Sequence, residues 1–303
     1  MRHIQHSTST DLSRVPPYTY FVVSAIFHYL GPAFAVLLFA HMGVLGVAWL
    51  RIASAAAVFA VWRQPWRLFR QSSWPQRRLL IALGVVLGLM NGSFYLAIAR
   101  LPLGTVGAIE FVGQIILAAV GVRTKRNAVA LALALVGGAM LTNVRLGGEP
   151  AGFVFAFANG VFFVLYVILG HRIARDGGQS GIDRLGGAML IALLVMTPLG
   201  LSEALPAFTD AQLLLAGVGV GLCSSVIPYV TDQLAMARLP RATFALLLSL
   251  LPAVASFMGA IILRQIPTPL EILGIGLIMG GVAIHQDARE TRPAGVECDS
   301  VAG

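Results

Sequence analysis

The sequence has very little charge for its length. Only 11% of its 303 residues are charged, 57% are hydrophobic, and the mean hydropathy is +0.83. An ordinary soluble domain has about a quarter of its residues charged. A single buried core cannot take up this much apolar surface, so the composition excludes a soluble globular domain and predicts an integral membrane protein.

Cysteine and lysine are also scarce, and common catalytic motifs are missing. The two cysteines, Cys223 and Cys298, form neither a disulfide framework nor a metal-ligand pattern, so we expect no metal site and no cofactor. The single lysine, Lys125, follows Thr124 and not a glycine, which excludes a Walker loop and ATP hydrolysis by this chain. The sequence also contains no H-E-x-x-H or G-x-S-x-G motif. We therefore do not expect an enzyme.

Ten apolar runs are long enough to span a membrane. They cover approximately residues 18–38, 43–62, 79–99, 103–122, 127–144, 151–170, 184–202, 211–236, 242–263 and 269–286. We predict an all-α membrane protein with ten transmembrane helices, flanked by cytoplasmic tails at 1–17 and 287–303. The first run follows Arg14 as a cleaved signal peptide would, but its length and its Gly31-Pro32 break favour a kinked transmembrane helix.

A short segment occurs twice in the chain. Residues 99–102 and residues 237–240 both read A-R-L-P, and each copy is a corner between two apolar runs. We therefore divide the chain into two five-helix repeats, residues 18–144 and 151–286. Because five is an odd number, the repeats must have opposite orientations in the bilayer, as in carriers that work by alternating access.

The basic residues lie almost entirely on one side of the predicted membrane. With the N-terminus in the cytoplasm, seventeen of the 21 Lys and Arg residues are cytoplasmic, and three, Arg100, Arg145 and Arg264, face outward. The remaining one, Arg51, lies within a span. This distribution places both termini in the cytoplasm. It explains the net charge of +8 as membrane orientation, so we expect a lipid bilayer and no nucleic acid as partner.

Polar side chains inside the predicted spans share helix faces. Asn91 and Tyr95 are four residues apart, as are Glu110 and Gln114. Asn159 and Tyr166 are two turns apart, His28 and Tyr29 are adjacent, and Tyr229 precedes Asp232 by three residues. They predict a polar, aromatic cavity lined by spans one, three, four, six and eight. The alternative is that these side chains only bond neighbouring helices. The candidates for substrate binding are His28, Asn91, Tyr95, Glu110, Gln114, Asn159, Tyr166 and Tyr229.

Three charged residues lie inside spans, where each costs roughly 2.5 to 3.5 kcal/mol at a helix centre. We expect Arg51 to pair with Glu110 or Asp232, although direct contact with substrate is an open alternative. Glu110 suits an ammonium group or a proton. Gly31, Pro32 and Pro252 interrupt helix hydrogen bonding and are candidate hinges.

The duplicated ten-span layout, the two A-R-L-P corners, Pro228-Tyr229 and Leu251-Pro252-Ala253 resemble the EamA-type transporters of the drug/metabolite transporter superfamily. Residues 110–113, E-F-V-G, are most similar to the bacterial inner-membrane threonine/homoserine exporters. The resemblance implies export of small amino acids, driven by an ion gradient or by exchange. Gln114 and Leu251 stand where those exporters carry proline and glutamate, and Asp232 stands where a glutamate is usual.

Three classes of function remain to be compared. A carrier of small metabolites, and of neutral amino acids such as threonine or homoserine in particular, agrees best with an inverted repeat around a polar cavity. The alternatives are a carrier of another metabolite or drug, and a channel. A membrane-embedded enzyme would need a catalytic cluster, which the sequence does not offer. The exact substrate, the coupling ion and the oligomeric state stay open.

Overall fold

The structure, a computed structural model, describes residues 16–121, 124–143, 149–174, 178–236 and 251–284. These residues form helices and short connections, without a strand among them. The helices are α1 (Pro17–Leu38), α2 (Val44–Arg63), α3 (Pro65–Gln71), α4 (Trp74–Ile98), α5 (Leu103–Gly121), α6 (Lys125–Asn143), α7 (Pro150–Ala174), α8 (Gly178–Ala204), η2 (Leu205–Phe208), α9 (Ala211–Gly221), η3 (Leu222–Val226), α10 (Ile227–Met236), α12 (Leu251–Leu263) and α13 (Pro269–Ile284).

Six helical segments are long and apolar enough to cross a membrane. They are Tyr18–Leu38, Val44–Arg63, Trp74–Ile98, Pro150–Gly170, Gly181–Phe208 and Ala211–Asp232. Three shorter apolar helices are Leu103–Val112, Leu251–Leu263 and Pro269–Gly281. The predicted class, an all-helical membrane protein, is confirmed. The count of ten spans and the inverted repeat stay predictions, because the second A-R-L-P corner at 237–240 lies outside the described residues.

Capping side chains mark where several helices begin. Asp210 accepts hydrogen bonds from the Gln212 and Leu213 amides at 2.8 and 3.3 Å, at the start of α9. At the start of α13, Glu271 accepts from the Thr268 amide at 2.8 Å, while the Glu271 amide donates to the Thr268 hydroxyl at 3.2 Å. These side chains satisfy backbone amides that have no partner within the helix, so polar residues collect at helix ends and leave the interiors apolar.

Helices α2 and α8 pack along much of their length and are held together at both ends. At one end, Glu203 of α8 accepts hydrogen bonds from the Leu45 and Gly46 amides of α2 at 2.9 and 3.2 Å. At the other end Arg63 of α2 forms an ion pair with Asp183 of α8. Glycines make the close approach possible: a Cβ at Gly46 would lie 2.5 Å from the Glu203 carbonyl oxygen.

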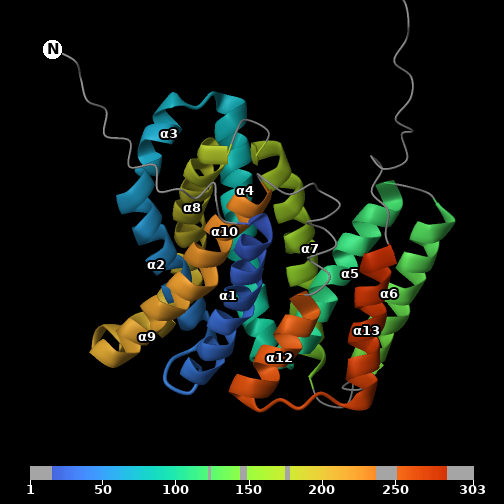
Figure 1. The fold of residues 1–303 in the computed structure, drawn as a ribbon. Helices are drawn as coiled ribbons and strands as arrows, with labels where there is room; N and C mark the ends of the chain where they lie inside the picture. The colour runs from blue at the N-terminus through green and yellow to red at the C-terminus, as the bar shows by residue number, and fades with distance from the viewer. Residues whose placement is uncertain (1–15, 122–123, 144–148, 175–177, 237–250, 285–303) are drawn as a thin grey trace, which may run out of the picture.

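A second closely packed pair, α6 and α13, lies beside α5 at one edge of the bundle (Figure 1). A Cβ at Gly137 of α6 would lie 2.5 Å from the Gly274 carbonyl oxygen of α13. Arg126 at the first turn of α6 donates to the Ile284 carbonyl at 2.6 Å. The backbones therefore touch, as small residues allow in membrane helices.

Several further contacts place helices from the first and second parts of the chain against each other. Helix α4 packs against α7, and α1 packs against α10; α5 packs against α7, and α1 packs against α12. Helices α5 and α12 also pack against each other. Five predicted spans separate α1 from α7, α4 from α10, and α5 from α12. Exchanging the two helices of each of these couples turns α4–α7 into α1–α10 and α5–α7 into α1–α12, and leaves α5–α12 as it is. The pattern of pairs is that of two equivalent halves.

The two ends of the bundle differ in charge. Helix α3 lies at one end, and the connection from α12 to α13 lies at the other (Figure 1). Five arginines, Arg63, Arg67, Arg70, Arg77 and Arg78, lie in or beside α3. Arg100, at the opposite end, is balanced by Glu149, with 3.6 Å between Nε and Oε2. The net positive charge is thus concentrated at the α3 end among these residues.

Candidate substrate-binding site

Glu110 lies on α5 and is only 4% exposed. The Tyr29 hydroxyl of α1 donates a long hydrogen bond of 3.4 Å to its Oε2 atom. Asn159 and Arg51 are close enough to act on its charge. A carboxylate can accept about four hydrogen bonds. Glu110 therefore has unused acceptor capacity inside the bundle.

Asn159 of α7 lies beside Glu110. The neighbouring residue, Gly160, lies at van der Waals distance from α5: a Cβ there would lie 3.6 Å from the Ile109 carbonyl oxygen and 3.8 Å from the Glu110 Cα atom. Asn159 is fully buried. Neither its amide nitrogen nor its amide oxygen is within hydrogen-bonding geometry of a partner. The amide thus lies beside the Glu110 carboxylate without a well-formed hydrogen bond to it.

Arg51 of α2 is bound to the π-helical turn η3. Its Nε atom donates to the Ser225 hydroxyl at 2.8 Å, and its Nη2 atom donates to the Ser224 carbonyl at 2.8 Å. A π turn interrupts the regular hydrogen-bond pattern of an α-helix and often occurs at functional sites. The backbones also come close here, because a Cβ at Gly221 would lie 2.8 Å from the Arg51 carbonyl oxygen.

The expected ion pair of Arg51 with Glu110 or Asp232 is absent among the described residues, where the salt bridges include neither acid. The physical reason is that the Ser225 hydroxyl and the Ser224 carbonyl of η3 already accept hydrogen bonds from Arg51. Asp232 lies on α10, next to Ser24 of α1. The sequence expectation of a charge pair is therefore corrected to a hydrogen-bonded arginine.

Tyr95 and Asn91 lie one turn apart on α4, and both are buried. The Tyr95 hydroxyl lies near Ser224 and Arg51 without meeting hydrogen-bonding geometry with either. Its ring centroid lies 5.4 Å from the Arg51 Cζ atom. Asn91 donates to the Leu87 carbonyl at 2.8 Å and is near the Tyr229 hydroxyl. The Tyr95 hydroxyl is therefore a third buried polar atom without a well-formed hydrogen bond, on the Arg51 side of the site.

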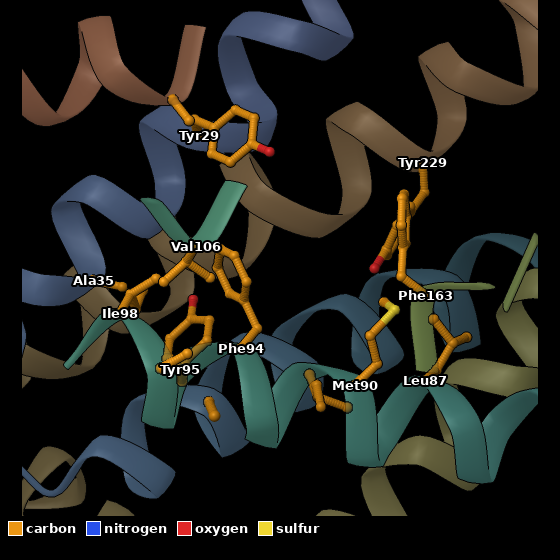
Figure 2. Packing of buried hydrophobic residues seen from close by; sticks show 14 of the residues in the cluster. Tyr29, Ala35, Leu87, Met90, Phe94, Tyr95, Ile98, Val106, Phe163 and Tyr229 are labelled. Atoms are coloured by element: carbon orange, nitrogen blue, oxygen red, sulfur yellow. The ribbon is translucent and has the colours of Figure 1, made fainter. Parts of the chain in front are cut away.

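Aromatic rings border these polar groups. Tyr229 of α10 and Tyr166 of α7 have ring centroids 6.1 Å apart, and Phe163 lies 6.1 Å from Tyr166. The His28 ring packs edge-on against Tyr29 at 5.1 Å. Figure 2 shows Tyr229 beside Phe163 and Met90, and Phe94 beside Val106, in the interior of the bundle. Seven of the eight predicted substrate-binding residues are brought to this region; the side chain of the eighth, Gln114, lies outside the described part of α5.

The predicted hinge residues lie next to the site. Pro32 is inside α1, and its neighbour Gly31 lies directly against Ser224 of η3, where no side chain would fit. Pro252 lies in α12, one residue after the first described residue of that helix. Helix α12 packs against both α1 and α5. All three residues therefore sit where helices of the two halves meet.

Sequence reasoning missed two parts of this arrangement. It gave no role to Tyr29 as the hydrogen-bond partner of Glu110, and it did not anticipate the π turn with Ser224 and Ser225 that receives Arg51. A signal was present, since two adjacent serines in an apolar run need partners. The period of a π turn, however, leaves no pattern in hydropathy.

Residues 150–285 match the model of the EamA-like transporter family. The "Threonine/homoserine exporter RhtA" of Escherichia coli (strain K12) is 33% identical over 254 residues, which cover 82% of this chain and 84% of that protein. The protein of the same name from Salmonella typhimurium (strain LT2) is 31% identical over 256 residues, with the same two coverages. A solved crystal structure aligns with a TM-score of 0.57 at 18% identity over 88% of this chain and 96% of that chain, which shows a shared fold.

Proposed function

Because the chain belongs to the EamA-like transporter family, and is thus a small-molecule exporter and not an enzyme, we propose that its substrates are neutral amino acids such as threonine and homoserine. The proposal places the carrier in the bacterial inner membrane, with both termini in the cytoplasm. Export would run by alternating access, driven by an ion gradient or by exchange.

The observation that carries the proposal is the set of buried polar atoms without partners. Glu110 has spare acceptor capacity. Neither the Asn159 amide nor the Tyr95 hydroxyl meets hydrogen-bonding geometry with a partner, although Glu110 lies near the first and Arg51 near the second. Unsatisfied polar groups in a membrane interior are costly, and they are characteristic of substrate sites. A substrate with several polar groups would satisfy them.

The charges of the site match those of a zwitterion. An amino acid needs an anion for its ammonium group and strong donors for its carboxylate. We assign Glu110 to the ammonium group. Arg51 and Tyr95, whose ring lies 5.4 Å from the Arg51 Cζ atom, are on hand for the carboxylate. The names of the relatives, which are threonine/homoserine exporters, support the same substrate class.

The arrangement of the helices supports alternating access. The pairs α1–α10 and α4–α7, and the pairs α1–α12 and α5–α7, exchange with each other when the two halves are exchanged. An inverted repeat of residues 18–144 and 151–286 would produce this pattern. Two half-channels that are equivalent in this way can open alternately to the two sides of the membrane.

The proposal is tested by comparing amino-acid pools in cells with and without the protein. We expect the cells that make it to hold less threonine and homoserine inside and to release more into the medium. Cells that make the Glu149→Gln variant serve as a control and should behave like those that make the wild type. Glu149 is an exposed acid that pairs with Arg100 far from the site. Unchanged pools, with the protein present in the membrane, would reject this substrate class.

A further inference from the structure

We propose that Asn159 recognises the side-chain hydroxyl group of the substrate, so that the carrier prefers hydroxy amino acids over alkyl amino acids of the same shape. This inference rests on the proposed function and assigns one part of the substrate to one residue. It concerns selectivity among amino acids rather than transport as such.

The first step is that Asn159 lacks the partners that a membrane asparagine normally has. It is fully buried on α7, and neither polar atom of its amide meets hydrogen-bonding geometry with a partner, although the Glu110 carboxylate is close by. Asn91 on α4 shows the usual arrangement, in which the side-chain amide donates to a carbonyl four residues earlier, at 2.8 Å. Since burial of an amide without hydrogen bonds is costly, a ligand is the simplest partner for Asn159.

The second step is the chemistry of the amide. It offers an oxygen that accepts and a nitrogen that donates, and a hydroxyl group can donate to the first or accept from the second. A methyl group of similar size can do neither. Threonine and valine differ by this one exchange, and homoserine and norvaline differ in the same way.

The third step is position. Asn159 is near the Glu110 carboxylate, and Gly160 lies at van der Waals distance from α5 at that point. With the ammonium group of the substrate on Glu110, Asn159 is a neighbouring polar group within reach of the rest of the substrate. Arg51 and Tyr95 provide the stronger donors for the carboxylate, so the amide is left for the side chain.

The fourth step is the apolar wall around the amide. Phe111 follows Glu110 on α5, Phe163 lies one turn beyond Asn159, and both are buried with ring centroids 6.0 Å apart. Water cannot easily replace a missing hydrogen bond in such surroundings. A site that is built to bond a hydroxyl group therefore discriminates against an alkyl substrate.

The test measures counterflow of labelled threonine, valine, homoserine and norvaline in proteoliposomes that contain the full chain. The wild type is expected to prefer each hydroxy amino acid over its alkyl partner by about tenfold. Asn159→Leu keeps the side-chain size and removes both polar atoms, so we expect it to bring both ratios close to one while valine transport is retained. Asn159→Ala provides a second variant if leucine disturbs insertion.

Thr197→Val is the matched control. Thr197 of α8 accepts a hydrogen bond from Trp49 at 3.1 Å and donates to the Leu193 carbonyl at 2.7 Å, so the variant removes a membrane hydroxyl outside the site. It should keep the wild-type ratios. Equal loss of all four activities in the Asn159 variants would overturn the inference, because the amide would then bind the zwitterion common to all amino acids. Transport of all four by the wild type without preference would also overturn it, and would leave the proposed function intact. If the wild type transports none of them, both proposals fail.

Discussion

At the scale of single residues, Arg51 is the buried charge with the best-defined partners. Its Nε and Nη2 atoms donate hydrogen bonds to oxygen atoms of η3, and its Cζ atom lies 5.4 Å from the Tyr95 ring centroid. The planar guanidinium group can reach a hydroxyl and a carbonyl oxygen together, which a lysine ammonium group does less well. Arg51 thus has a structural role in addition to the carboxylate binding proposed for it.

We expect Arg51→Met to lower the stability of the protein. The substitution leaves the buried Ser224 carbonyl and the Ser225 hydroxyl without their donor, which costs about 1–3 kcal/mol for each group left unsatisfied. Arg51→Lys should lose less, since it keeps one donor in reach. Thermal unfolding in detergent measures both. A melting temperature that is the same in all three proteins would show that the bonds to η3 contribute nothing.

The residue scale also shows how far sequence reasoning goes. Polar residues in apolar runs stand out because they are costly in a membrane, so Glu110, Asn91, Tyr95, Asn159 and Tyr229 could be listed from the sequence alone. Their partners could not be, because a partner depends on which helices pack together. The expected charge pair was wrong for this reason: Arg51 faces η3, and a hydrogen-bonding carbonyl is invisible in a sequence.

At the scale of helices, the segment from α9 through η3 to α10 differs most from the regular helix that the apolar run predicted. The π turn lies where α1, α2 and this segment meet, since Gly31 lies against Ser224 and Gly221 lies against Arg51. Pro32 and Pro252 lie in α1 and α12, which pack against each other. Weak points in backbone hydrogen bonding therefore gather next to the proposed site.

The proline in α12 provides the prediction at this scale. A proline removes one backbone hydrogen bond and lets a membrane helix bend. We expect Pro252→Ala to stiffen α12, and so to slow exchange severalfold while substrate affinity changes little, because the proline does not itself bind substrate. Exchange rates and half-saturation concentrations for threonine distinguish the two effects. If both change only slightly, Pro252 is a packing residue and not a hinge.

At the scale of the whole molecule, the two ends of the bundle differ as a membrane protein requires. The five arginines around α3 lie at one end, and Arg100 lies at the other end with Glu149. Apolar runs and the arginine distribution were sufficient to predict the helical membrane class and the ends of most helices. They were not sufficient for the pairing of the halves, which depends on glycine contacts such as Gly46 against Glu203 and Gly137 against Gly274.

The charge asymmetry leads to a prediction of orientation. Because basic residues are retained in the cytoplasm, the α3 end should face the cytoplasm, and so should residue 303. A reporter enzyme that is active only outside the cytoplasm should give no signal when fused at residue 303. A fusion at Glu149, on the opposite end, should be active and serves as the control. A strong signal at residue 303 would contradict the proposed topology.

The most direct test of the account is counterflow of labelled threonine in proteoliposomes loaded with unlabelled threonine. We compare the wild type with Glu110→Gln, which keeps the size of the side chain and removes its charge, with Asp232→Asn in the second half, and with the exposed control Glu149→Gln. The account predicts saturable accumulation of label by the wild type and by Glu149→Gln, a partial loss in Asp232→Asn, and no accumulation in a folded Glu110→Gln protein. Normal counterflow by Glu110→Gln, or a flux that neither saturates nor responds to internal threonine, would contradict a carrier that holds an amino acid at Glu110.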